Sequence, residues 1–179
     1  MSSYIRPKRQ GAAVFFTVAL ADRGGDLLLR EVDRLRDAVA QTRADLPFGV
    51  LAWVLLPDHL HTVWQLPEGD GDFALRWRLI KGRFAHGLPA QLRSASKERA
   101  GEKGIWQRRY WEHHIRGADD LARHIGYCRL DPVRHGLVER PEEWRYASVR
   151  GDVRAYGDAA PQQSRHVQDD ARRPVWFGE

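Results

Sequence analysis

Two histidines lie one residue apart in the stretch HLHTVWQL, directly after a long apolar run. Successive side chains of a β-strand point to opposite faces, so a strand here places His59 and His61 on the same face. Imidazole nitrogens that converge in this way are common metal ligands, and with an oxygen ligand they suit Mn²⁺ or Mg²⁺ shared with a phosphate group. The pair by itself is equally compatible with the polar edge of an ordinary strand.

A phenol and a carboxylate later in the chain are candidates for the rest of such a site. In the stretch ARHIGYCRLDPVRHG, the residues His124, Tyr127, Asp131 and Arg134 follow one another at helical spacing and share one helix face. If that face packs against the histidines, Asp131 completes a metal site and Tyr127 points at the group that the metal polarises. Pro132 disfavours helical angles in the residue before it, so we expect Asp131 near the helix end.

The elements that must position these residues follow from the periodicity of apolar residues. Alternating or continuous apolar runs predict strands at 12–20, 48–56, 59–66 and within 106–115. Apolar residues at steps of three and four predict helices at 26–44, 73–84 and 118–131. The order βαββαβ plus one helix predicts an α+β fold: a ferredoxin-like, split βαβ antiparallel sheet with two helices on one face. The additional helix carries Tyr127 and can cover the other face.

Three further expectations concern the arrangement of the chain. The continuous run FGVLAWVLL, residues 48–56, is typical of a central strand covered on both faces, and we expect it to pair with the stretch PDHLHTVWQL, residues 57–66. Residues 88–104 are small, polar and charged without a period, which indicates a flexible loop. We expect a single domain over residues 1–150 and a partly ordered tail over residues 151–179.

Composition limits the class of protein. The 179 residues include 29 Lys and Arg against 24 Asp and Glu, a net charge of +5 that favours a polyanionic partner. The single Cys128 excludes an internal disulfide and a thiolate-rich zinc cluster, as expected for a reducing compartment such as the cytoplasm. The first apolar stretch is too short to span a bilayer, so no membrane anchor is expected.

Three motifs carry a resemblance to a known family. VLLPDHLH, IWQRRYWEHHIR and HIGYCRLDPVRHG, in this order and spacing, resemble the REP-associated tyrosine transposases, a branch of the single-tyrosine HUH endonucleases. The resemblance covers about residues 4–147. One position departs from the family pattern: Asp131 stands where the family usually has asparagine, which we expect to alter the choice of metal.

The resemblance implies a reaction and assigns roles in it. It makes Tyr127 the nucleophile, His59 and His61 metal ligands, and Asp131 the third ligand of a Mg²⁺ or Mn²⁺ ion. Single-stranded DNA is then nicked and rejoined at palindromic REP-type hairpins through a 5′-phosphotyrosine intermediate. The resemblance also favours a monomer, without excluding a dimer, in the cytoplasm at the nucleoid. Two alternatives stay open. One is a noncatalytic module that binds single-stranded nucleic acid on the same fold, and the more distant one is a small metallohydrolase that uses the histidine pair to activate water.

Contacts with DNA are expected from basic residues around this site, although a solvated charged face explains the same pattern. The candidates are Arg6, Lys8, Arg76, Arg78, Lys81, Arg83, Arg108, Arg109, His113 and Arg116. The rival phenol Tyr110 lies in an aromatic segment, where we expect it to pack in the core. The same segment contains Trp106 and Trp111, for which base stacking and packing both remain open.

Overall fold

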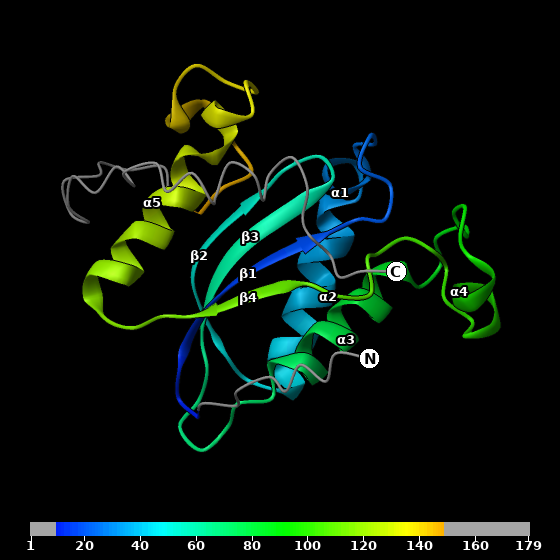
Figure 1. The fold of residues 1–179 in the computed structure, drawn as a ribbon, viewed down its shortest axis with the longest axis horizontal. Helices are drawn as coiled ribbons and strands as arrows, with labels where there is room; N and C mark the ends of the chain where they lie inside the picture. Colours follow the sequence, from blue (N-terminus) through cyan, green and yellow to red (C-terminus); the bar gives the residue numbers. More distant parts are fainter. Residues whose placement is uncertain (1–9, 149–179) are drawn as a thin grey trace.

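A four-stranded antiparallel sheet forms the centre of the computed structural model, which describes residues 10–148 (Figure 1). The strands lie in the order β2-β3-β1-β4, and the helices cover both faces. In chain order the elements are β1 (Ala13–Ala19), α1 (Leu27–Arg30), α2 (Val32–Asp45), β2 (Gly49–Leu55), β3 (His59–Gln65), α3 (Phe73–Ala85), α4 (Ala95–Arg99), β4 (Trp111–His114), α5 (Ala118–Arg134) and a 3-10 turn, η1 (Pro141–Glu143). This is the predicted ferredoxin-like order with one additional helix, α5.

The position of β2 differs from the prediction. It is an edge strand of the sheet and not a central one, although it pairs with β3 as expected, while β1 pairs with β3 and β4. Its outer edge is covered by a returning segment of the chain: the backbone N–H of Leu55 donates to Tyr146, and that of Trp53 donates to the Ser148 hydroxyl. Because other parts of the chain cover the outer edge of β2, its continuous apolar run does not require a position in the centre of the sheet.

Helices α2 and α3 form the layer on one face of the sheet (Figure 1). The predicted apolar stripe of α3 is buried in that layer, and its four residues are Phe73, Trp77, Ile80 and Phe84. The single helix predicted at 26–44 is instead two helices, α1 and α2, which adjoin at Glu31. This layer holds the larger of the two apolar clusters, in which Trp64 of β3 stacks on Trp77 at 4.3 Å.

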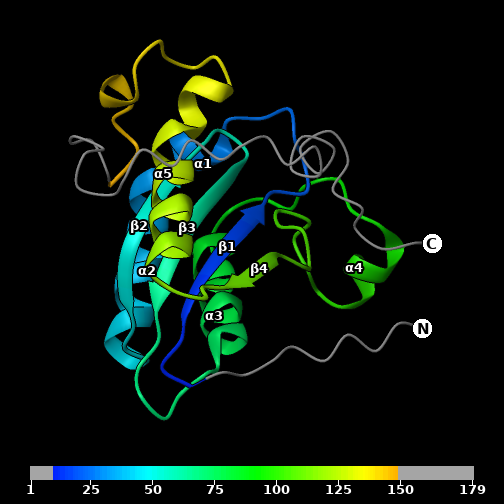
Figure 2. The same ribbon diagram turned by 60° about the vertical axis from the view of Figure 1, so that its left-hand side comes forward.

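Helix α5 lies against the opposite face of the sheet (Figure 2). Its residues Ile125 and Cys128 pack with Phe15 of β1 and Val63 of β3 in the second apolar cluster. The helix continues to Arg134, three residues beyond its predicted end at Asp131. It therefore includes Pro132. Tyr127 and Asp131 thus stand on a continuous helix that faces the same side of the sheet as His61.

The segment 88–104, predicted as a flexible loop, contains the short helix α4. The Ser94 hydroxyl caps this helix by accepting from the backbone N–H of Lys97. The Lys97 ammonium in turn donates to the carbonyl of Trp106, which ties the segment to the body of the protein. Within residues 10–148, every helix is too short or too polar to cross a bilayer. The tail expected over residues 151–179 lies outside the described residues.

Candidate active site

Both predicted metal-binding histidines have one ring nitrogen engaged and the other turned toward α5. Nδ1 of His59 lies 2.6 Å from a carboxylate oxygen of Asp58, and Nδ1 of His61 lies 2.9 Å from the Thr17 hydroxyl. Their Nε2 atoms face Asp131, at 3.9 Å and 3.3 Å respectively from its Oδ2. A partner on one ring nitrogen fixes the orientation of the ring and leaves the other nitrogen for a ligand. The structure therefore brings the two histidines and Asp131 together as predicted.

Asp131 is the most unusual charged group of this site. It is 1% exposed, and among the described residues its Oδ2 has no hydrogen-bond partner, although His61 lies beside it. Burial opposes its ionisation, but the imidazoles of His61, His135 and His59 around it lower its pKa overall. A buried carboxylate that stays ionised needs a compensating positive charge.

His135 joins this group and was missed by the sequence analysis. Its Nε2 lies 3.8 Å from Oδ1 of Asp131, one helical turn away, and its ring centroid lies 5.1 Å from that of His59. These three residues each offer a ligand atom, and the three atoms lie within 4.8 Å of one another. The four-residue spacing from Asp131 was the available signal, but the preceding proline had placed His135 beyond the expected helix.

The donors of this cluster fit a divalent cation. The nitrogen-to-oxygen separations of 3.3 to 3.9 Å are below the span of about 4.2 Å that two ligand bonds of about 2.1 Å can bridge. Burial lowers the pKa of His59, which keeps its imidazole in the neutral form that binds metals. An orphaned carboxylate oxygen beside the ring nitrogens of histidines is therefore chemically suited to Mn²⁺, and to Mg²⁺ when further oxygen ligands are present.

Tyr127 stands next to these donors. Its ring meets the ring of His61 edge-on at 5.0 Å, and the guanidinium of Arg134 lies 4.8 Å from its centroid. Burial, followed by the nearby charge of Asp131, raises the pKa of the Tyr127 phenol above its usual value, against the opposing effect of Arg134. The hydroxyl is therefore protonated at neutral pH, and it becomes a nucleophile only as its proton leaves.

A second cluster of similar composition lies on the same face of the sheet, and we call His113, Asp120 and His124 the anchoring cluster. Nε2 of His113 lies 2.8 Å from Oδ2 of Asp120. This oxygen also accepts from the backbone N–H of Arg116, and Oδ1 of Asp120 accepts from Arg123. Although burial opposes it, these hydrogen bonds lower the pKa of Asp120 to about 2. Its three ligand atoms also lie within 4.8 Å of one another, but the carboxylate already has its partners.

The basic residues predicted on α3 lie on the face opposite the histidines. Arg76 is 1% exposed, and its guanidinium binds Asp70 and backbone carbonyls, so it holds the interior together rather than facing solvent. Arg83 binds Thr42 and Asp45 of α2, and Lys81 donates to the carbonyl of Gln107. Among the candidates on α3, Arg78 is the exposed one.

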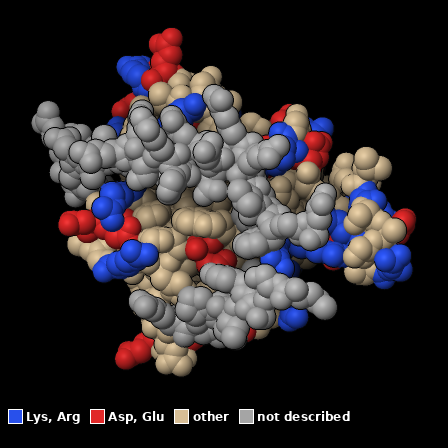
Figure 3. All heavy atoms as spheres, in the orientation of Figure 1, with Lys and Arg blue, Asp and Glu red and all other residues tan. Residues whose placement is uncertain are grey.

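The remaining candidate DNA contacts lie near β4 or outside the described residues. Arg108 pairs with Glu102, while Arg109 and Arg116 are exposed. Arg6 and Lys8 fall outside residues 10–148. Figure 3 shows Lys and Arg in separate groups around the rim of the described surface, several of them beside Asp or Glu. Tyr110 is buried in the α3 layer, with its ring 5.9 Å from that of Phe16.

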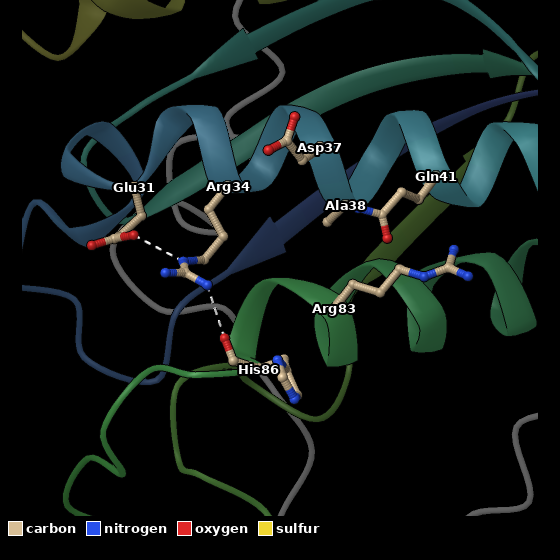
Figure 4. A pocket seen from close by; sticks show the side chains of 7 residues that line it. All are labelled: Glu31, Arg34, Asp37, Ala38, Gln41, Arg83 and His86. Carbon is tan, nitrogen blue, oxygen red and sulfur yellow. Dashed lines mark hydrogen bonds and ion pairs between the residues drawn. The ribbon is translucent and has the colours of Figure 1, made fainter.

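One hollow of the described residues lies away from this site. It has a volume of about 530 Å³ and lies between α2 and α3, on the opposite side of the sheet from the histidines (Figure 4). The guanidinium of Arg34 crosses it from Glu31 to the carbonyl of His86. Because its lining is polar and internally paired, this hollow gives no second candidate for chemistry.

Comparison with known proteins gives concordant relatives. The chain is 41% identical over 153 residues to the REP-associated tyrosine transposase of Escherichia coli (strain K12), which is 86% of this chain and 86% of the relative. A relative from Haemophilus influenzae (strain ATCC 51907 / DSM 11121 / KW20 / Rd) with the same family name is 43% identical over 157 residues, 87% of this chain and 89% of the relative. No protein-family model matches the chain.

A solved structure shares the fold. The REP-associated tyrosine transposase bound to a REP hairpin superposes with a TM-score of 0.72 at 36% sequence identity. The match covers 100% of this chain and 93% of that chain. The four-stranded antiparallel sheet with helices on both faces is therefore an arrangement found in a solved transposase.

Proposed function

Since this chain belongs to the REP-associated tyrosine transposase family, we propose that it nicks and rejoins single-stranded DNA at hairpins of REP type, with Tyr127 as the nucleophile. The observation that carries the proposal is the meeting of Tyr127 with His61, edge to face at 5.0 Å, beside the buried Asp131. A noncatalytic binding module has no need for a phenol and an orphaned carboxylate oxygen at the same place. The family name is that of an enzyme, and this arrangement supports it.

The proposed reaction exchanges one phosphate ester for another. The Tyr127 hydroxyl oxygen attacks the phosphorus of the scissile phosphodiester, the P–O3′ bond breaks, and the 3′-oxygen leaves with a proton as a free hydroxyl. The product is a 5′-phosphotyrosine ester, and attack by a 3′-hydroxyl on this ester reverses the step. Because the ester linkage is conserved, rejoining needs no nucleotide cofactor.

The residues of the chain prepare this step in distinct ways. His59, His61 and Asp131, with His135 beside them, are the residues that would hold Mg²⁺ or Mn²⁺. A bound divalent ion supplies charge that polarises the phosphate and makes phosphorus a better electrophile. Thr17 and Asp58 orient the two imidazoles, and Arg134 favours the loss of the phenolic proton from Tyr127.

A single chain supplies all of these groups. Tyr127 and Asp131 come from α5 and the histidine pair from β3, and they meet within one copy of the protein. A monomer that cuts with its own tyrosine is therefore sufficient for the proposed reaction. A hairpin DNA substrate supports the expectation that the protein acts in the cytoplasm at the nucleoid.

The proposed function is tested by the formation of a covalent adduct between the protein and DNA. Hairpin DNA with unpaired flanks and a label at the 5′-phosphate side of the cut is incubated with the protein and Mn²⁺ or Mg²⁺, then separated under denaturing conditions. We expect a protein–DNA adduct that Tyr127→Phe abolishes and that the matched control Tyr110→Phe retains. An adduct that persists in Tyr127→Phe would show that Tyr127 is not the nucleophile.

A further inference from the structure

Trp111 lies in the same row of the sheet as the metal-binding histidines. Thr17 of β1 is the register partner of His61 in β3 on one side and of Trp111 in β4 on the other. Register partners point to the same face, and adjacent strands are about 4.8 Å apart, so Trp111 lies roughly 10 Å across the sheet from His61. Both residues therefore open onto the α5 side of the sheet.

The indole of Trp111 is exposed, which is unusual for so large an apolar group. It is 42% exposed, and it is the aromatic member of the four large exposed apolar residues within residues 10–148. The other three, Leu51, Leu92 and Leu137, are aliphatic. Packing within the protein therefore does not account for its whole surface.

The same indole contacts two aromatic rings of the protein, those of His113 and Phe15. The His113 ring lies parallel to it, with an interplanar angle of 8° and centroids 5.9 Å apart, and the ring of His124 stacks on His113 at 4.7 Å. The edge of Phe15 meets Trp111 at 5.7 Å. A planar ring fixed on one side and open on the other is a preformed surface for a second planar ring, at little cost in side-chain entropy.

Charged residues past the other end of β4 indicate which kind of planar ring would bind to Trp111. Past the end of β4, Arg116 and Arg123 line an open hollow of about 320 Å³ at the beginning of α5. The acidic groups in that lining are Asp119 and Asp120, and Asp120 is already paired with His113 and Arg123. An aromatic platform at one end of a strand, with guanidinium groups past the other end, is a combination that can bind the bases and phosphates of single-stranded nucleic acid.

We propose that Trp111 stacks an unpaired base of the DNA strand that runs through the active site. This inference rests on the proposed function and adds a position at which the protein binds that strand. The roughly 10 Å between His61 and Trp111 corresponds to about three nucleotides at the stacked spacing of 3.4 Å per strand. The stacked base therefore lies within about three nucleotides of the scissile phosphate, outside the paired stem of the hairpin.

The experiment measures binding without cleavage. Dissociation constants are determined in the Tyr127→Phe background for the bare hairpin and for the same hairpin with four unpaired nucleotides on the 5′ side, on the 3′ side, or on both. We expect Trp111→Ala to weaken binding of at least one tailed hairpin by about 10-fold, the range of one lost stacking contact, and to leave the bare hairpin unchanged. Trp111→Phe, which retains a ring, should keep most of the tail-dependent affinity.

The controls separate this inference from the proposed function. Leu92→Ala removes another exposed apolar side chain and should change no dissociation constant. Equal affinity of Trp111→Ala and its parent for every tailed hairpin would overturn the inference, as would an equal loss on the bare hairpin. If the unaltered chain formed no covalent adduct, the proposed function would fail, yet the tail-dependent loss would still demonstrate the stacking surface because binding is measured without cleavage.

Discussion

Two clusters of histidine and aspartate lie on the α5 side of the sheet, and they differ in how their carboxylates are satisfied. Asp120 of the anchoring cluster accepts hydrogen bonds from His113, from the backbone of Arg116 and from Arg123. Asp131, with the histidine pair, is more deeply buried and has an oxygen without a hydrogen-bond partner among the described residues. Residue types alone do not distinguish a ligand set from a structural network, but hydrogen-bond satisfaction does.

The difference assigns separate tasks to the two ends of α5. Asp120, in the first turn, binds the end of β4 through His113 and thereby fixes the helix on the sheet. Asp131, in the last turn, lies between His59 and His61 at distances that suit a shared cation. Tyr127 stands between the two ends, next to His61. The anchoring cluster is therefore expected to act on stability, and the other cluster on metal binding and chemistry.

The largest expected effect comes from replacing one histidine of each cluster with alanine and comparing the two variants. Loss of groups that only support a metal ligand typically costs 10- to 100-fold in metal affinity or activity, so His61→Ala, which removes a proposed ligand, should lower Mn²⁺ affinity and cleavage by more than about 100-fold. His113→Ala should leave Mn²⁺ affinity unchanged and lower the melting temperature instead. Isothermal titration with Mn²⁺ and the adduct assay measure the two outcomes.

Two results would contradict the assignment of stability to the anchoring cluster and of metal binding to the histidine pair. Loss of Mn²⁺ binding in His113→Ala would make the anchoring cluster a metal site. Full cleavage activity in EDTA would remove the metal role from the histidine pair altogether. His86→Ala, a substitution of an exposed histidine on the α3 side of the sheet, is the control for nonspecific metal binding and should behave as the unaltered chain does.

The next effect is on stability and its dependence on pH. Asp120→Asn removes hydrogen bonds to a charged acceptor and should lower the free energy of unfolding by about 2 kcal/mol at pH 7. A carboxyl whose pKa is lowered on folding stabilises the protein above its unfolded pKa, and this contribution is lost as the pH falls through the folded value, which is about 2 here. Urea unfolding at pH 7 and at pH 2 to 4 measures the difference.

The matched control for this substitution is its neighbour. Asp119 is exposed in the same helical turn, so Asp119→Asn makes the same change of charge and should alter the free energy of unfolding by no more than about 0.5 kcal/mol. If Asp120→Asn and Asp119→Asn were equally stable at pH 7, the hydrogen bonds of the anchoring cluster would contribute nothing to the free energy of unfolding. The anchoring cluster would then have no role in stability.

Sequence reasoning reached the fold and four members of the site because strand alternation and helical spacing are local rules. His59 and His61 must share a strand face, and Tyr127 and Asp131 must share a helix face. It missed His135 because proline costs a helix one hydrogen bond but does not always end it. Here the helix continues, and the N–H of His135 donates to the carbonyl of Asp131.

The other errors arose where distant segments decide the outcome. The apolar run of β2 indicated a central strand, but the segment that ends at Ser148 returns to cover its edge, and sequence spacing does not reveal such a return. Arg76 was grouped with surface charges because Arg is usually exposed. Its burial depends on Asp70 and on the carbonyls of Leu46 and Pro47, which the fold brings around it.

The smallest expected effect concerns Asp131, the position at which the family resemblance leads us to expect asparagine. Asp131→Asn introduces that residue, keeps an oxygen donor and removes one negative charge. Cleavage with Mn²⁺ should therefore persist within about 10-fold, while Mn²⁺ affinity falls because neutral amide oxygens are weaker ligands than carboxylates. The rise in melting temperature caused by added Mn²⁺ should shrink accordingly, since stabilisation follows ligand concentration relative to the dissociation constant. An inactive but folded Asp131→Asn variant would mean that the carboxylate does more than hold a cation, and that the orphaned oxygen is needed for the chemistry itself.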